Sequence, residues 1–373
     1  DAPTRLQAPP FTLDLPLAET TIAETLGGSG YDTAFFGKWH LNRHYQRYLG
    51  WSPTHGPGNQ GFETAIEDFG AHPYDWANSK PETFSTPDTF PRDTMVKRVC
   101  DYLRSEHDAP FFVMASSFYV HTPVKTTCTW LVDKYEGLIP ESSPQRAKRI
   151  QYAAFVETMD HYVGEMLNAL EESNLANDTL VVFMSDNGGH PEFTGNRPLR
   201  GSKWNLYEGG VRVPMIFSWP GHIASGSTTA TPIIGYDLLP TFADLAGVDQ
   251  PTTDGVSLKP LFDDACWQPS RNLIWHFPYY HPETGYGKAL EEIGINDFAI
   301  SKTRPQSAIR LGSMKLILFQ ETGRYELYDL EKDISEQNDL AASYPEEAKK
   351  LLHILRAELK SMNARQATPV DLE

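Results

Sequence analysis

The feature that most constrains this chain is an alternation of helical segments with short, continuous apolar runs. Ala147 to Ser173 has the apolar spacing of a long amphipathic helix, whereas Phe111 to Phe118 and Thr179 to Met184 are almost entirely apolar. A run of that kind is typical of a strand buried on both faces of a sheet. The alternation predicts an α/β sandwich with a large, mostly parallel central sheet flanked by helices. Further helices are expected over Glu19–Leu26, Asp93–Glu106 and Tyr236–Ala246, and further strands over Tyr31–Phe36 and Val211–Trp219.

The pattern changes after about Phe262. Short alternating strands follow there, separated by the turn sequences Gly312-Ser313 and Thr322-Gly323, and an amphipathic helix is expected over Pro345–Met362. We therefore predict two domains, an α/β catalytic domain over residues 1–262 and a C-terminal α+β subdomain with an antiparallel sheet over residues 263–373.

Composition excludes several classes of partner. The 32 Lys and Arg residues against 49 Asp and Glu residues give a formal net charge of -17, so we expect no nucleic-acid partner. No apolar run approaches the roughly 18 to 20 residues that span a bilayer, so we expect no transmembrane segment. The cysteines Cys100, Cys128 and Cys266 cannot form a disulfide framework and are expected to be thiols.

Four polar clusters follow predicted strands. They contain two ammonium groups, two imidazoles and an adjacent carboxylate and amide, a set that suits a hard divalent cation beside a tetrahedral oxyanion. The chemistry indicated is ester hydrolysis at sulfur or phosphorus. The clusters are Gly37–His40, Tyr119–Pro123, Ser185–Gly189, and Leu199–Lys203 with Glu208–Pro214.

Each cluster also has a simpler explanation. The Asp186-Asn187-Gly-Gly sequence is common in turns, Lys38 alone reads as a surface lysine, and His121 before Thr-Pro fits an ordinary loop histidine. Their joint occurrence, each at the end of a predicted strand, favours a site, because ligands of α/β sheets bind beyond the carboxyl ends of the strands.

These motifs, in this order, resemble those of the sulfatases of the alkaline phosphatase superfamily. The resemblance extends from about Leu15 to the end of the chain and includes Gly-Lys-Trp-His-Leu at 37–41, Ser-Asp-Asn-Gly-Gly at 185–189 and Leu-Arg-Gly-Ser-Lys at 199–203. It implies that Asp186 and Asn187 bind one Ca²⁺ ion and that Lys38 and Lys203 hold sulfate oxygens. It also implies that His121 donates a proton to the leaving alcohol and that His40 takes the proton from the covalent hydrogen-sulfate intermediate.

In sulfatases these motifs follow a strand with paired aspartates and a Cys-x-Pro-Ser-Arg motif, whose first residue becomes the formylglycine nucleophile. Neither element stands ahead of Lys38, and Asp1 to Pro16 resembles the segment that follows them. The expectations are a cropped chain, a separate N-terminal chain, or a non-catalytic protein that binds sulfated glycans, and residues 1–373 alone are not expected to cleave sulfate esters. Cys266-Trp-Gln-Pro-Ser-Arg has one residue too many before its proline, and we do not assign it as the nucleophile.

The resemblance favours a sulfated carbohydrate as substrate and a periplasmic or secreted bacterial location; a homo-oligomer is a further possible assembly. Aromatic and imidazole side chains around Gly61–Trp76 and Trp275–His281 are of the kind that contact sugars, although packing between subdomains explains them equally well. A phosphoesterase of the same superfamily is the alternative enzyme. The candidate substrate-binding residues are His72, His276, His281 and Arg310.

Overall fold

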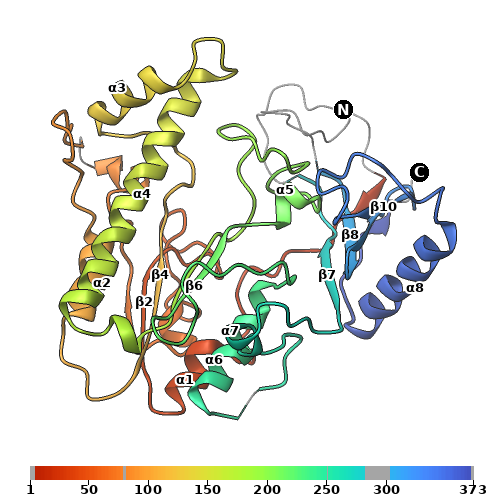
Figure 1. The fold of residues 1–373 in the computed structure, drawn as a ribbon, viewed down its shortest axis with the longest axis horizontal. Coiled ribbons are helices and arrows are strands. Elements are labelled where there is room, and N and C mark those ends of the chain that lie inside the picture. Colours follow the sequence, from red (N-terminus) through yellow and green to blue (C-terminus); the bar gives the residue numbers. More distant parts are fainter. Residues whose placement is uncertain (1–4, 79–80, 250, 282–302, 371–373) are drawn as a thin grey trace. The chain divides into compact units, whose positions relative to one another are not determined.

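The computed structural model describes residues 5–78, 81–249, 251–281 and 303–370, which divide into two compact units (Figure 1). Unit 1 comprises Asp1–Phe11, Phe183–Ile216 and Pro269–Glu373, and unit 2 comprises Thr12–Val182 and Phe217–Gln268. Each unit therefore gathers separate stretches of the chain. The contiguous division at residues 262/263 remains a prediction.

Unit 2 is built on a parallel sheet with the strand order β3-β2-β4. The central strand β2 (Asp32–Gly37) pairs with β3 (Thr64–Ile66) on one side and with β4 (Phe111–Ser116) on the other. Its helices are α1 (Ile22–Gly27), α2 (Thr94–Leu103), α3 (Thr129–Leu138), α4 (Arg146–Glu172), α6 (Leu238–Ala246) and α7 (Pro260–Asp263), with short 3₁₀ turns at η1 (Pro57–Asn59), η2 (Pro73–Asn78), η3 (Ala176–Asp178) and η4 (Gly235–Asp237).

The main core of unit 2 lies between β2 and the helices α2 and α4. Phe36 of β2, Val99 of α2 and Tyr162 of α4 are each less than 4% exposed in one apolar cluster. The Asp93 side chain accepts a hydrogen bond from the Val96 amide at 2.9 Å, which caps the first turn of α2. This packing fixes the position of β2, whose carboxyl end leads into the Gly37–His40 cluster.

The expectation that Phe111–Phe118 is buried on both faces is wrong at Met114 and Ala115. Met114 is 43% exposed, and β4 is an edge strand among the residues that the structure describes. The strands β5 (Val181–Met184) and β6 (Met215–Ser218) form a separate two-stranded sheet. The α/β class is confirmed, and a larger parallel sheet remains a prediction.

Unit 1 contains the predicted antiparallel C-terminal sheet, with the strand order β10-β9-β8-β7. The last long helix packs on one face of this sheet (Figure 1), where Ile309, Leu316 and Leu351 are fully buried. A short ladder pairs Leu6 with Pro369. The elements are β1 (Leu6–Gln7), α5 (Glu208–Val211), β7 (Asn272–Phe277), β8 (Gln306–Leu311), β9 (Met314–Phe319), β10 (Tyr325–Asp329), α8 (Pro345–Ser361) and β11 (Thr368–Pro369). Within the described ranges, no helix is both long and apolar enough to cross a membrane.

Candidate active site

Lys38 stands at the carboxyl end of two neighbouring strands of unit 2, as predicted. It follows β2 directly, and its amide donates to the carbonyl oxygen of Ser116, the last residue of β4, at 2.8 Å. Gly37 has a φ of 103°, and a Cβ atom there would come within 2.1 Å of that same oxygen. Glycine is therefore required for the close approach of the strands that positions Lys38.

The His121 ring is fixed through its Nδ1 atom. Nδ1 lies 2.7 Å from the carbonyl oxygen of Thr122 and 3.1 Å from the hydroxyl of Tyr74. A carbonyl oxygen can only accept, so the proton of the neutral ring is on Nδ1. A proton exchanged with a substrate must then travel through Nε2, on the far side of the ring.

His72, a predicted substrate-binding residue, is buried and supports the His121 backbone. Its Nδ1 accepts from the Tyr74 amide at 3.3 Å, so Nε2 carries the proton and donates to the His121 carbonyl oxygen at 2.9 Å. The ring is 0% exposed, among Tyr74, Phe118, Tyr119 and Phe155. Burial, together with the nearby charges of His121 and Lys38, lowers the pKa of His72 to about 4.

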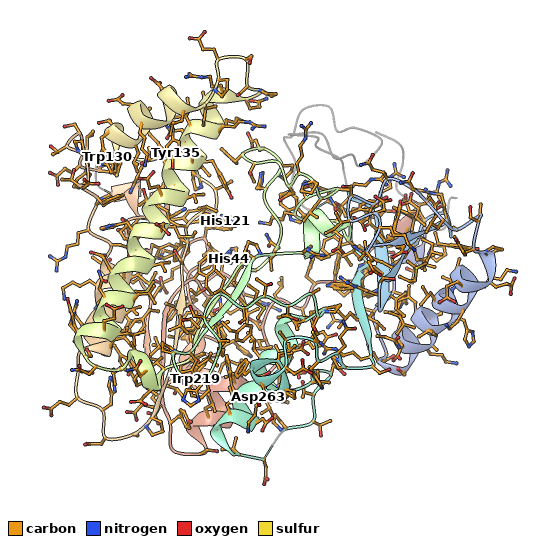
Figure 2. All side chains as sticks on the ribbon, viewed as in Figure 1. His44, His121, Trp130, Tyr135, Trp219 and Asp263 are labelled. Carbon is orange, nitrogen blue, oxygen red and sulfur yellow. The ribbon has the colours of Figure 1, made fainter. Side chains whose placement is uncertain are left out.

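The exposed His40 belongs to a row of rings that leads to His121. Its Nε2 lies 3.2 Å from the Nε2 of His44, and one of these two nitrogens must be the donor. Tyr48 contacts His44 at a ring-centroid distance of 4.6 Å and Tyr74 at 5.5 Å. Figure 2 shows His44 and His121 on neighbouring loops of unit 2. The structure therefore brings both predicted acid–base histidines to one side of this unit.

In unit 1, the Asp186–Gly189 turn is bonded to the loop that carries Lys203. The Lys203 amide donates to the Gly189 carbonyl oxygen at 3.1 Å, and the Gly188 amide donates to the Gly210 carbonyl oxygen at 3.0 Å. A Cβ atom on Gly188 would lie 1.8 Å from the Gly209 oxygen. The Ser185–Gly189 cluster and the Leu199–Lys203 cluster with Glu208–Pro214 thus form one closely packed group of loops.

Arg200 holds the Lys203 loop against the antiparallel sheet. Its Nη1 donates to the Tyr328 hydroxyl at 3.1 Å and to the Glu336 carbonyl oxygen at 2.9 Å, and its guanidinium lies 4.3 Å from the centre of the Tyr207 ring. The Tyr207 and Tyr328 hydroxyls both donate to the Glu326 carboxylate. This network positions the loop by contacts that reach β10.

A buried ion cluster lies at the base of α5. The Lys315 side chain is 0% exposed, and its Nζ is 2.8 Å from Glu208 Oε1 and 2.9 Å from Glu336 Oε1. Burial works to raise the pKa of Glu208, but Lys315 outweighs it and the pKa is lowered. Burial raises the pKa of Glu336 to about 7, against the opposing effect of Lys315. One ammonium group therefore serves two carboxyl groups of different proton affinity.

The remaining candidate residues of unit 1 have different surroundings. His281 packs edge-on against Trp204 at 4.5 Å, beside Lys203, whose Nζ is 5.0 Å from the Trp204 ring centre. His276 accepts from the Ser307 hydroxyl at 2.8 Å and donates to the Arg365 carbonyl oxygen at 2.6 Å. Both of its ring nitrogens therefore bond within unit 1, and its assignment to substrate binding remains a prediction. Arg310 donates to the Gly312 carbonyl oxygen at 3.0 Å, and burial lowers its pKa.

Asp186 and Asn187 supply the oxygen ligands that a hard cation prefers, but too few of them to form a complete site. The Asn187 side-chain nitrogen donates to the Gly188 carbonyl oxygen at 3.0 Å, which leaves its side-chain oxygen as the metal-binding atom. Ca²⁺ takes about six to eight oxygen ligands. No group of three or more His, Cys, Asp or Glu side chains within the described stretches could hold a metal ion. These two residues would supply part of a calcium site.

Sequence reasoning missed four residues of this region, His44, Tyr48, Tyr74 and Arg200. The first three lie in segments without helical or strand periodicity, so spacing gave no reason to select them. Arg200 lies within the Leu199–Lys203 motif, where only Lys203 was selected. The structure groups Lys38, His40 and His121 in unit 2, and Asp186, Asn187 and Lys203 in unit 1. The meeting of these two groups in one cleft remains a prediction.

Comparison with known proteins gives one consistent family. The sulfatase family model matches residues 4–248, and the model described as N-sulphoglucosamine sulphohydrolase, C-terminal, matches residues 202–365. A sulfatase of Formosa agariphila is 31% identical over 407 residues, covering 91% of this chain and 70% of the relative. Human arylsulfatase A is 30% identical over 400 residues, covering 92% of this chain and 72% of the relative.

Solved structures show the same fold. The complex of Ps i-CgsB with k-i-k-neocarrahexaose has a TM-score of 0.69 at 24% identity and covers 95% of this chain and 77% of that chain. The complex of BT4656 with its substrate D-glucosamine-2-N,6-O-disulfate has a TM-score of 0.67 at 19% identity and covers 95% and 84%. On the family match and the two relatives, the chain belongs to the sulfatase family of sulfuric ester hydrolases.

Proposed function

We propose that the protein hydrolyses a sulfate ester of a carbohydrate. The observation that carries the proposal is the fixed His121 ring, whose Nδ1 bonds require Nε2 to deliver the proton. A sugar alkoxide is a poor leaving group, so a positioned general acid has a large effect on it. Similar folds bind a carrageenan hexasaccharide and a glucosamine disulfate, which supports a carbohydrate as the alcohol half.

The other candidate residues have separate roles in this proposal. Lys38 and Lys203 neutralise the negative charge on the sulfuryl oxygens in the transition state. His40 takes a proton when sulfate is expelled, and the facing Nε2 of His44 at 3.2 Å is the group through which that proton moves on. All of these side chains are supplied by the described part of the chain.

The proposed reaction would also use a calcium ion and a formylglycine nucleophile. The sulfatase family usually uses a divalent metal ion, and Asp186 and Asn187 would hold a Ca²⁺ ion that neutralises sulfate charge when bound. Burial raises the pKa of both the Cys100 and the Cys128 thiol, so these are poor nucleophiles.

We also propose a periplasmic or secreted location. The charge of -17 and the absence of a disulfide framework among three cysteines are compatible with it. Fractionation of the native host, followed by detection of this chain in the periplasm, the medium or the cytoplasm, tests the location directly. Recovery in the cytoplasm would contradict it.

The function is tested by the dependence on the leaving group. We would compare His121→Ala with the unchanged complete protein on a sulfated oligosaccharide and on p-nitrophenyl sulfate, and measure sulfate release. Loss of the general acid should reduce the rate on the sugar sulfate roughly 10²- to 10⁴-fold and affect the aryl ester much less, because p-nitrophenolate leaves without a proton. His353→Ala, an exposed histidine on α8, is the matched control.

Three results would contradict the proposal. Equal losses on both esters would remove His121 as the acid. Faster release of phosphate from p-nitrophenyl phosphate than of sulfate from the sulfate ester would favour the phosphoesterase alternative. Binding of sulfated glycan without turnover of any sulfate ester would favour a non-catalytic protein.

A further inference from the structure

We propose that Tyr48 is the surface on which the substrate's sugar ring packs while His121 protonates the leaving oxygen. This inference rests on the proposed function, since it assigns the group that binds the alcohol half of the ester. Tyr48 is 50% exposed although it contacts three other aromatic rings. An exposed ring held in a row beside a proton donor needs a reason other than core packing.

The position of Tyr48 relative to His121 is set through Tyr74. The Tyr48 and Tyr74 ring centres are 5.5 Å apart, and the Tyr74 hydroxyl is 3.1 Å from His121 Nδ1. The alcohol carbon chain is attached to the oxygen that His121 protonates, so it must extend from that point. Tyr48 is an exposed ring that is linked to His121 through a single intervening ring, that of Tyr74.

The loop around Tyr48 is held in an unusual conformation. Gln46 and Leu49 have φ values of 61° and 62°, in the left-handed region that costs energy for residues other than glycine. Leu49 is only 1% exposed and packs with Phe69 and Phe118. Both ends of the turn, Gln46 and Leu49, thus have strained backbone conformations. In this conformation Leu49 is buried and Tyr48 is exposed.

The residue before Tyr48 anchors the same turn. Arg47 Nε donates to Glu67 Oε1 at 2.8 Å, and its guanidinium lies 4.0 Å from the Phe69 ring centre. Glu67 Oε2 also accepts from the Trp51 amide at 2.9 Å. Tyr48 is therefore flanked by two anchored residues, and its backbone is ordered before any ligand arrives, which lowers the entropy lost on binding.

The chemistry of the surface matches a pyranose ring. Tyrosine offers an apolar face for the C–H groups of a sugar and a hydroxyl for its oxygens. It has no cationic group, so sulfate binding is left to the lysines and Tyr48 acts on the sugar. Tyr48 should therefore determine which esters bind and leave the chemical step unchanged.

The experiment separates binding from turnover. We would label the complete protein with 3-fluorotyrosine, assign the Tyr48 signal by its loss in Tyr48→Phe, and add a carrageenan hexasaccharide or a glucosamine sulfate while recording ¹⁹F spectra. In parallel, Tyr48→Ala should raise KM for the sulfated sugar roughly 3- to 10-fold with kcat nearly unchanged, and should leave KM for p-nitrophenyl sulfate unchanged. Tyr48→Phe should retain most of the affinity.

Tyr45→Ala is the matched control, because Tyr45 is 46% exposed on the same loop and lies outside the row of rings. A Tyr48 signal that neither sugar moves, or equal KM changes for sugar and aryl esters, would overturn the inference even if the protein is an active sulfatase. A moved Tyr48 signal in a protein that releases no sulfate would support the inference and overturn the proposed function.

Discussion

The two units hold their functional side chains in opposite ways. In unit 2, the His121 ring is fixed by the Tyr74 hydroxyl and by its own bond to the Thr122 carbonyl oxygen, and neutral His72 donates to the His121 backbone carbonyl. In unit 1, the loop of Lys203 is fixed by Arg200, next to a buried cluster of one lysine and two glutamates. The histidine proposed to exchange a proton is thus supported by neutral partners, and the lysine proposed to hold sulfate is supported by charged ones. The difference shows how the support of a side chain can preserve its chemistry.

The largest expected effect comes from removing the positive charge of Lys315 from the unit 1 cluster. Lys315→Met leaves Glu208 and Glu336 buried without their ammonium partner, which should lower the free energy of unfolding by about 3 to 5 kcal/mol. Chemical denaturation monitored by tryptophan fluorescence measures the change. The exposed Lys332, which pairs with Asp329 at 2.7 Å, provides the control Lys332→Met, and its unfolding should be nearly unaffected. Similar losses in both variants would mean that burial of the cluster is unimportant.

Removing the Lys203 side chain should slow the reaction without lowering the stability of the fold. Lys203→Ala should reduce transition-state stabilisation by about 2.7 to 4 kcal/mol, as for other oxyanion donors. The measurement is kcat/KM for a sulfate ester in the complete protein, with the exposed Lys349→Ala as control. Unchanged turnover of Lys203→Ala would remove Lys203 from the site.

Acidification should change the stability of the two units in opposite directions. The pKa of His72 is about 4 in the folded protein, below its ordinary 6.5, so its contribution to stability is lost as pH falls from 6.5 toward 4. The pKa of Glu336 is about 7, above its ordinary 4.5, so its contribution is present at low pH and lost as pH rises through 7. Each effect is at most on the order of 3 kcal/mol.

Hydrogen exchange resolves the two responses. Between pH 7 and pH 5, amides of β4 and α4 should become less protected, and amides of β8 and β9 should become more protected, after correction for the intrinsic exchange rate. His72→Gln should flatten the first response and Glu336→Gln the second. Parallel changes in both units would show that these two groups do not govern their pH dependence.

The smallest expected effect concerns one hydroxyl group. Tyr74→Phe removes a hydrogen-bonding group 3.1 Å from His121 Nδ1 and leaves the bond to the Thr122 carbonyl oxygen, so the loss should be about 1 kcal/mol, or roughly fivefold in rate on a sugar sulfate. Tyr45→Phe is the control. A loss as large as that of His121→Ala would indicate that the carbonyl bond alone does not hold the ring.

The elements with strong periodicity were predicted well. The expected helices over Ala147–Ser173 and Pro345–Met362 correspond to α4 and α8, and the C-terminal strands are present in the expected order. Val211–Trp219 was predicted less well, because its first residue ends α5 and only Met215–Ser218 forms a strand. An apolar run does not reveal where hydrogen-bonded pairing begins.

The motifs were easier to find than their supports. Lys38 and His121 follow β2 and β4, as the sequence predicted, but the contact that His72 makes depends on a carbonyl oxygen that lies 49 positions along the chain. His276 was assigned to substrate binding from its aromatic neighbours, although it lies within β7 and bonds to Arg365. Such contacts are set by tertiary packing, which local spacing does not encode.

The pairing of Leu6 with Pro369 has a consequence for biosynthesis. Contacts between residues so far apart in sequence close a very long loop and form slowly. During translation, β1 emerges long before its partner β11 exists, so this ladder can form only after β11 has been synthesised. Unit 1 also needs Phe183–Ile216 and Pro269–Glu373 together, whereas the segments of unit 2 end at Gln268. Unit 2 can therefore fold on the ribosome first, and unit 1 is completed last.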